Sequence, residues 1–91
     1  MNLTETLNFL KTSGLKIIAC HEKAELSHTE ADLTSPSAII MGSEESGIHI
    51  ENLATSTEQI RIPLIGHTSS LNVSTATGII LFETLRQRSA H

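Results

Sequence analysis

Three short apolar runs, without polar alternation, constrain the fold of this chain more than any other feature. They are Leu15–Cys20 (LKIIAC), Ser37–Met41 (SAIIM) and Gln59–Ile65 (QIRIPLI). Continuous apolar strands are typical of parallel sheets, because helices cover both faces of such a sheet. The polar segment 21–36 ends in Ser-Pro and predicts a connection with at most one short regular piece. We therefore expect an α/β fold, with a mainly parallel sheet and helices on both faces.

Helices are predicted before, between and after these runs. The first, from about Leu3 to Ser13, begins at a capping-box pair, Asn2 with Glu5. A short helix is indicated around residues 50–55 by its apolar spacing. The last is expected to run from about residue 72 to 88. The apolar residues expected on the buried faces of the first and last helices are Leu3, Leu7, Leu10, Val73, Ala76, Ile80 and Leu81.

A ligand site is predicted where two of the strands end. Ligands of open α/β sheets bind beyond the carboxyl ends of the strands, and two glycine-bearing loops follow such ends, Gly42–Gly47 and Gly66–Leu71. Glycine lets the backbone approach a ligand closely. The last helix would add amide donors at its positive end, beside Ser70. Glu44 is the one carboxylate placed to orient a polar group.

Each of these residues also has a purely structural interpretation. Gly42 and Gly47 fit simple turns, and Glu44 fits a solvated loop charge. Ser70 and Asn72 are residue types that commonly cap a helix. The first loop has neither the Walker A pattern nor the G-x-G-x-x-G dinucleotide pattern. Spacing alone therefore leaves the role of the two loops open.

The composition argues against several classes of function. A net charge of −4 and only two aromatic residues, Phe9 and Phe82, disfavour a main nucleic-acid surface. The five histidines lack H-x-x-x-H spacing, and with Cys20 as the one cysteine, neither a zinc site nor an intrachain disulfide is expected. The chain also shows no apolar run of bilayer-spanning length and no secretory leader pattern. These features predict a soluble cytoplasmic chain without a metal.

Two blocks of the sequence are more specific when read with their flanks. Ser37–Gly47 (SAIIMGSEESG) is an apolar strand that ends in Gly-x-Glu-x-x-Gly. In Ile60–Arg88, an Ile-Pro pair and a glycine loop precede Ser-Leu-Asn-Val-Ser and a helix. The blocks, their order and their separation resemble signatures of the SpoU (TrmH-like) RNA 2′-O-ribose methyltransferases of the SPOUT superfamily. The resemblance extends over nearly the whole chain, from about Leu7 to Arg88.

The resemblance implies an α/β domain whose C-terminal segment forms a trefoil knot, and a homodimer. It implies that S-adenosyl-L-methionine (AdoMet) is bound in the knot and that its methyl group passes to a ribose 2′-hydroxyl of RNA. By position, the implied cofactor-binding residues are Gly42, Ile62 and Leu71. The implied catalytic residues are Glu44, Ser70 and Asn72.

The family's first signature, which contains an Asn and the Arg presumed to activate the ribose hydroxyl, has no counterpart here. We therefore expect residues 1–91 to be the C-terminal portion of the methyltransferase domain, inactive alone, with a natural short form as the alternative. The loop Gly42–Gly47 and the run Ser70–Ala76, with small residues at Ser74 and Ala76, most resemble the branch that acts on 23S rRNA, and tRNA is the second choice. A non-catalytic AdoMet-binding or dimerisation module is the alternative from another class.

Overall fold

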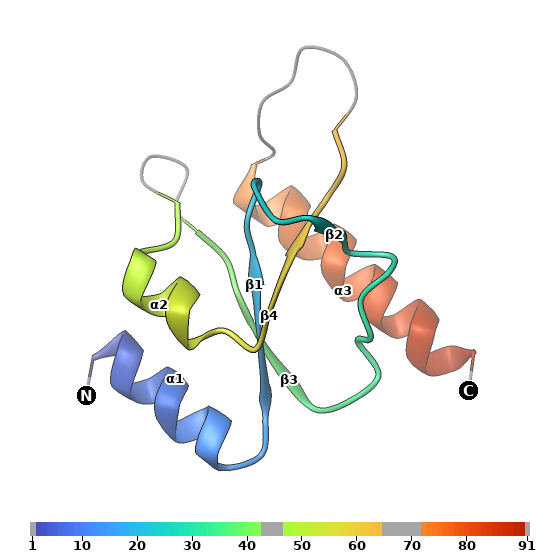
Figure 1. Ribbon diagram of the computed structural model, residues 1–91. Helices are drawn as coiled ribbons and strands as arrows, with labels where there is room; N and C mark the ends of the chain where they lie inside the picture. The colour runs from blue at the N-terminus through green and yellow to red at the C-terminus, as the bar shows by residue number, and fades with distance from the viewer. Residues whose placement is uncertain (1, 43–46, 65–71, 91) are drawn as a thin grey trace.

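The computed structural model describes residues 2–42, 47–64 and 72–90 of the chain (Figure 1). These ranges contain three helices and four strands. In chain order they are α1 (Leu3–Thr12), β1 (Lys16–Cys20), β2 (Leu26–Ser27), β3 (Ser37–Ile40), α2 (Ile50–Thr55), β4 (Glu58–Arg61) and α3 (Val73–Ser89). None of these helices is long and apolar enough to cross a membrane.

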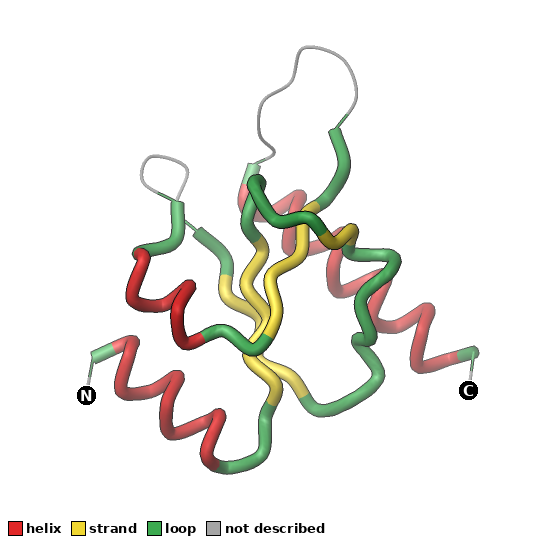
Figure 2. Tube along the Cα trace, in the orientation of Figure 1, coloured by secondary structure: helices red, strands yellow, loops and turns green. Residues whose placement is uncertain are grey.

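The four strands form one parallel sheet in the order β2-β4-β1-β3. Helices α1 and α2 lie on one face of this sheet and α3 lies on the other (Figure 2). The predicted α/β class, parallel sheet and coverage of both faces are therefore confirmed. The predicted trefoil knot depends on residues 65–71, which lie outside the described residues, and it stays a prediction.

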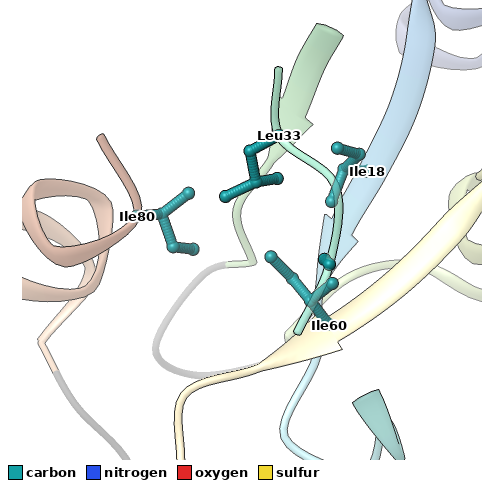
Figure 3. Packing of buried hydrophobic residues seen from close by; sticks show 5 residues of the cluster. Ile18, Leu33, Ile60 and Ile80 are labelled. Carbon is teal, nitrogen blue, oxygen red and sulfur yellow. The ribbon is translucent and has the colours of Figure 1, made fainter. Parts of the chain in front are cut away.

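Alternate residues of β1 supply the two hydrophobic cores. Ile17 and Ala19 face α1 and α2, where they pack with Leu7 and Ile40. Ile18 faces the opposite side and joins a cluster with residues from β4, α3 and the connection after β2. That cluster, shown in Figure 3, consists of Ile18, Ala31, Leu33, Ile60 and Ile80. Full burial of both faces explains why this strand is a continuous apolar run.

The strand around residue 60 is shorter than predicted. β4 ends at Arg61, whereas the apolar run continues to Ile65. Pro63 has no N–H group to donate to a ladder, and a proline restricts the residue before it, here Ile62. β4 lies inside the sheet, between β2 and β1. Because Pro63 cannot donate a hydrogen bond to either neighbouring strand, β4 ends before Pro63.

Helix α1 begins as its capping-box pair predicts. The Glu5 N–H donates to Asn2 Oδ1 at 2.8 Å, which satisfies one of the free amides of the first turn. Leu7 is buried and Leu10 packs against the same core. Leu3 is 54% exposed, so its predicted place on the buried face is wrong. It lies at the first position of the helix, beyond the edge of the core.

Helix α3 buries a narrower set of residues than predicted. Ala76 and Ile80 are buried as expected, and Val73 is half-buried. Leu81 is 58% exposed, which contradicts its predicted burial. Because successive helical residues point about 100° apart, the burial of Ile80 turns Leu81 away from the sheet. Glu83 shares this buried face with Ala76 and Ile80.

The C-terminal half of α3 holds the connection between β2 and β3 through side-chain bonds to its backbone. The Gln87 amide accepts from the Leu33 N–H at 2.8 Å and donates to the Ala31 carbonyl at 2.9 Å. Arg88 donates to the carbonyls of Leu33 and Ser35 at 3.2 and 3.0 Å. The connection therefore crosses the α3 face of the sheet in a fixed path.

Candidate functional site

The carboxyl ends of the three longer strands meet at one edge of the sheet. β1 is followed by His21, β3 by Met41 and Gly42, and β4 by Ile62. Because β1 lies between β3 and β4, Gly42 and Ile62 follow the two strands that flank it. Two of the predicted cofactor residues are thus brought to the same edge, Gly42 as the predicted strand ends indicated and Ile62 because β4 ends earlier than predicted.

The connections leaving β1 and β3 run to opposite faces of the sheet. After β1 the chain forms the short β2 and then crosses the α3 face, where Ala31 and Leu33 pack with Ile80. After β3 the chain leads to α2 on the other face. In open α/β sheets, the point at which the connections of neighbouring parallel strands diverge is where ligands usually bind, in the crevice outside the carboxyl ends of the strands. Gly42 lies at this position.

Gly42 occupies a place that no other residue fits without displacing backbone. A Cβ atom at this position would lie 2.6 Å from the Gly47 carbonyl carbon and 2.8 Å from the Ile48 nitrogen. Gly47 itself has a φ of +66°, in the left-handed region that favours glycine. The two glycines therefore bring the backbone on either side of residues 43–46 into close contact. Both glycines therefore have a structural role.

Ile62 follows β4 and is half-buried. Its side chain packs against the core cluster on the α3 side of the sheet. The same cluster includes Cys20 and Met41, each at the carboxyl end of a strand. Burial raises the pKa of the Cys20 thiol, which keeps it neutral and argues for a packing role rather than a nucleophilic one. This edge is therefore apolar beneath the ends of the strands.

Asn72 is the N-cap of α3. Its Oδ1 accepts from the Ser74 N–H at 2.8 Å and from the Thr75 N–H at 3.3 Å. The structural interpretation of Asn72 as a helix cap is thus confirmed, and its side chain is exposed at the start of the helix. The catalytic role implied by the resemblance stays a prediction.

The other three predicted site residues, Glu44, Ser70 and Leu71, lie outside the described residues. Among those that the structure does describe, no three His, Cys, Asp or Glu side chains gather as metal ligands would.

His21 is a position that the sequence analysis passed over with the other histidines. It is half-buried at the end of the central strand, and its N–H donates to the Ile60 carbonyl at 2.8 Å. Its place directly after an apolar run was the available signal, because such positions form the ligand edge of a parallel sheet.

The chain matches the sequence profile of the SpoU rRNA Methylase family over residues 1–82. It belongs to this family. A SpoU relative, the 23S rRNA (guanosine-2′-O-)-methyltransferase RlmB of Pseudomonas syringae, is 45% identical over 89 residues. The tRNA (guanosine(18)-2′-O)-methyltransferase of Escherichia coli K12 is 45% identical over 80 residues, which make up 87% of this chain and 35% of that relative.

Solved structures of SpoU enzymes have the same fold. The TrmH/SpoU tRNA modifying enzyme of A. aeolicus superposes with a TM-score of 0.90 at 38% identity, over 98% of this chain and 46% of its own. An AdoMet-bound rRNA methyltransferase of Sinorhizobium meliloti superposes with a TM-score of 0.86 at 31% identity, over 93% of this chain and 33% of its own. The match to the P. syringae enzyme likewise covers 98% of this chain but 36% of the relative. The chain thus spans about a third of the curated SpoU relatives.

Proposed function

We propose that this chain is the cofactor-binding half of an AdoMet-dependent RNA 2′-O-ribose methyltransferase that acts on 23S rRNA. The observation that carries the proposal is Gly42, a SpoU-signature glycine that lies at the crevice between β1 and β3. Relatives named as ribose methyltransferases of 23S rRNA and of tRNA support the reaction class. A SpoU structure with bound AdoMet supports the cofactor.

The described residues fit AdoMet. Gly42 keeps the backbone at the crevice free of a side chain, and Ile62 supplies apolar surface at the neighbouring strand end. With Leu71, which matches by position, these residues would hold the cofactor mainly through backbone groups and apolar contacts. Bound AdoMet supplies an electrophilic methyl group on its sulfonium sulfur.

The polar residues of the chain would orient the ribose. Asn72 fixes the start of α3, and its position matches the catalytic Asn of the SpoU motif, as Glu44 and Ser70 match the other catalytic positions. Orienting the 2′-hydroxyl in line with the methyl group is a positioning task. Its deprotonation is assigned to the Arg of the first SpoU signature, which this sequence does not contain. We therefore propose that residues 1–91 need the rest of the domain for activity.

Most Lys and Arg side chains of this chain bind groups within the chain, which supports a main RNA-binding surface outside residues 1–91. Four of the six Lys and Arg residues bind the chain's own backbone or carboxylates. They are Lys11, Lys16, Arg86 and Arg88. Phosphate contacts require clustered cations, and the net charge here is −4.

A homodimer is part of the proposal, and the outer face of α3 supports it. Leu81, Phe82 and Leu85 are 58%, 71% and 62% exposed and are neighbours on the helix surface. An exposed apolar group of this kind, next to the exposed Gly78, is typical of an interaction surface.

Titration calorimetry of AdoMet into this chain tests the cofactor site. Methylation assays of the longer enzyme that contains it, on 23S rRNA and on tRNA, test the reaction. Methyl transfer to a ribose of 23S rRNA is expected. Transfer to a tRNA ribose would show that tRNA, and not 23S rRNA, is the substrate. Transfer to a base or a protein would refute the proposed function. AdoMet binding without methylation by the longer enzyme would favour a non-catalytic module.

A further inference from the structure

Two of the six Lys and Arg side chains have no role in holding the chain together. Four of the six bind carbonyls or carboxylates of the chain itself, namely Lys11, Lys16, Arg86 and Arg88. The other two are Lys23 and Arg61. Within the part of the chain that the structure describes, neither side chain makes a hydrogen bond or an ion pair. These two cations are therefore available to a ligand.

Lys23 and Arg61 lie beside each other at the carboxyl edge of the sheet. Arg61 is the last residue of β4, and Lys23 lies in the connection between β1 and β2, the two neighbours of β4. Cys20 and Leu26 end this connection, and both pair with Ile60. Because they are two strand spacings of about 4.8 Å apart, the residues between them cross β4 (Figure 1). Lys23 is the middle residue of the crossing, so it lies next to the end of β4.

The Arg61 side chain points to the face of the sheet that carries α1 and α2. Ile60 and Ile62, on either side of it in the sequence, pack with the cluster on the α3 side, and strand residues alternate between faces. The described core under α1 and α2 takes its strand residues from β1 and β3. Arg61 therefore lies beside that core, half-buried. A guanidinium group that is partly withdrawn from water and lacks a partner gains from binding an anion.

The acidic residues around Lys23 limit the size of such an anion site. Glu22 and Glu25 flank Lys23 and are exposed. The connection that contains Lys23 therefore carries more carboxylates than cations, whereas a surface that follows a nucleic-acid backbone needs clustered cations. The pair Lys23 and Arg61 thus suits a single phosphate group and not a stretch of RNA backbone.

The pair lies on the same edge of the sheet as the predicted cofactor residues. Ile62 directly follows Arg61, and Gly42 follows β3 on the other side of β1. A ribose within RNA carries phosphates on its 3′ and 5′ oxygens, so a phosphate always lies close to the 2′-hydroxyl that accepts the methyl group. Phosphate contacts fix the position of a nucleic acid on a protein without reading its sequence.

We propose that Lys23 and Arg61 together bind one phosphate adjoining the methylated ribose and so position its 2′-hydroxyl. The inference rests on the proposed function, because the phosphate belongs to the RNA substrate. The planar guanidinium of Arg61 binds the phosphate through two parallel N–H groups, and the ammonium of Lys23 adds a second charge. The chain thereby makes one RNA contact of its own, although the main RNA-binding surface lies outside it.

The salt dependence of RNA affinity tests this contact. A transcript of 23S rRNA is titrated, without AdoMet, into the enzyme that contains this chain and into its Lys23→Gln, Arg61→Gln double variant. The affinity of the variant is expected to be about tenfold lower, because charge-assisted hydrogen bonds are lost. The slope of log affinity against log salt is expected to become shallower by about 0.7 to 0.9, the value for one phosphate contact. A change in folded fraction alone would leave this slope unaltered.

Three single variants sharpen the test. Lys16→Gln removes the same charge from the opposite edge of the sheet and is expected to keep the slope. Arg61→Lys keeps the charge without the planar group and is expected to restore the slope but only part of the affinity. Lys23→Gln changes an exposed turn, so it tests the contact by itself if Arg61→Gln fails to fold.

Three results would overturn the proposal. One is an unchanged slope in the double variant, and another is an equal change of slope in Lys16→Gln. The third is a loss of AdoMet affinity in the double variant with RNA affinity kept, which would assign the pair to the carboxylate of the cofactor. RNA binding that depends on Lys23 and Arg61, without any methylation, would refute only the proposed function. Methylation with an unchanged slope would refute only this inference.

Discussion

Gly42 and Gly78 would respond to an added methyl group in opposite ways. In Gly42→Ala the new Cβ would lie 2.6 Å from the Gly47 backbone, so the loop that begins at the crevice has to shift. We expect AdoMet affinity to fall about tenfold or more, measured by calorimetry, because a small misplacement of a positioning group is costly.

Gly78→Ala is the matched control, because a Cβ there meets nothing within 4 Å and the position is an exposed part of α3. It is expected to stabilise the chain by about 1 kcal/mol and to leave AdoMet affinity unchanged. Equal losses of affinity in both variants would contradict the placement of the site.

Asn72 allows its two roles to be separated. Asn72→Ala removes the acceptor for the Ser74 and Thr75 amides and is expected to cost about 1 kcal/mol, measured by urea unfolding. Asn72→Ser keeps a capping hydroxyl and is expected to restore most of that stability.

In the longer enzyme, Asn72→Ser is expected to lose methylation although the helix cap is kept. Full activity of that variant would show that Asn72 acts as a cap and nothing more.

At the scale of elements, α3 is held by hydrogen bonds around the buried carboxylate of Glu83 as well as by apolar packing. Hydrogen bonds from Arg86 and then Gln87 lower the pKa of Glu83 from its ordinary value of 4.5 to about 2. Gln87 in turn binds the backbone of Ala31 and Leu33. The network Arg86–Glu83–Gln87 thereby connects the helix to the crossover before β3.

The lowered pKa gives a defined pH window. A carboxyl group with a depressed pKa in the folded state contributes stability above its unfolded pKa, and that contribution is lost as the pH falls toward the folded value. The chain is therefore expected to lose stability between about pH 4.5 and pH 2 in part through Glu83.

Urea midpoints across this window compare the unaltered chain with Glu83→Gln, which should show a shallower dependence on pH. Glu25→Gln, at an exposed position, is the control. Identical slopes for the unaltered chain and Glu83→Gln would contradict the assignment.

The sequence predicted the elements better than their buried faces. Asn2 and Glu5 gave the start of α1, and Asn72 gave the start of α3, because a cap depends on residues adjacent in sequence. The buried face of α3 could not be predicted from adjacent residues, because the helix carries apolar residues on more than one side. Ile80 and Leu81 both fit a core, and only the docked sheet selects Ile80.

The same distinction holds for the site. Gly42 was predicted at the ligand edge because strand ends follow from local sequence, whereas Ile62 was predicted inside a strand and reaches that edge because β4 ends at Arg61. The order β2-β4-β1-β3 had no such signal, so the crevice between β1 and β3, and the place of His21 at the central strand, required the structure.

At the scale of the whole molecule, the outer face of α3 predicts an assembly. Phe82 is 71% exposed, so Phe82→Asp is expected to leave the unfolding free energy of a monomer nearly unchanged. In the longer enzyme the same change buries a charge in the proposed dimer interface, and sedimentation velocity is expected to show monomers.

Ile80→Ala, on the buried side of the same helix, is the contrasting variant and is expected to cost about 2–5 kcal/mol by leaving a cavity. A dimer that survives Phe82→Asp would place the interface elsewhere.

The strand order also has a consequence for how the chain is made. No two neighbouring strands in β2-β4-β1-β3 are consecutive in the sequence, so no hairpin can nucleate this sheet. Ile18 of β1 pairs with Glu58, and Leu26 of β2 pairs with Ile60. Strands β1 and β2 therefore leave the ribosome before β4, the strand that both of them contact. Sheets built from such distant pairings fold slowly. During synthesis the apolar run of β1 is therefore exposed until its partner strands have been made.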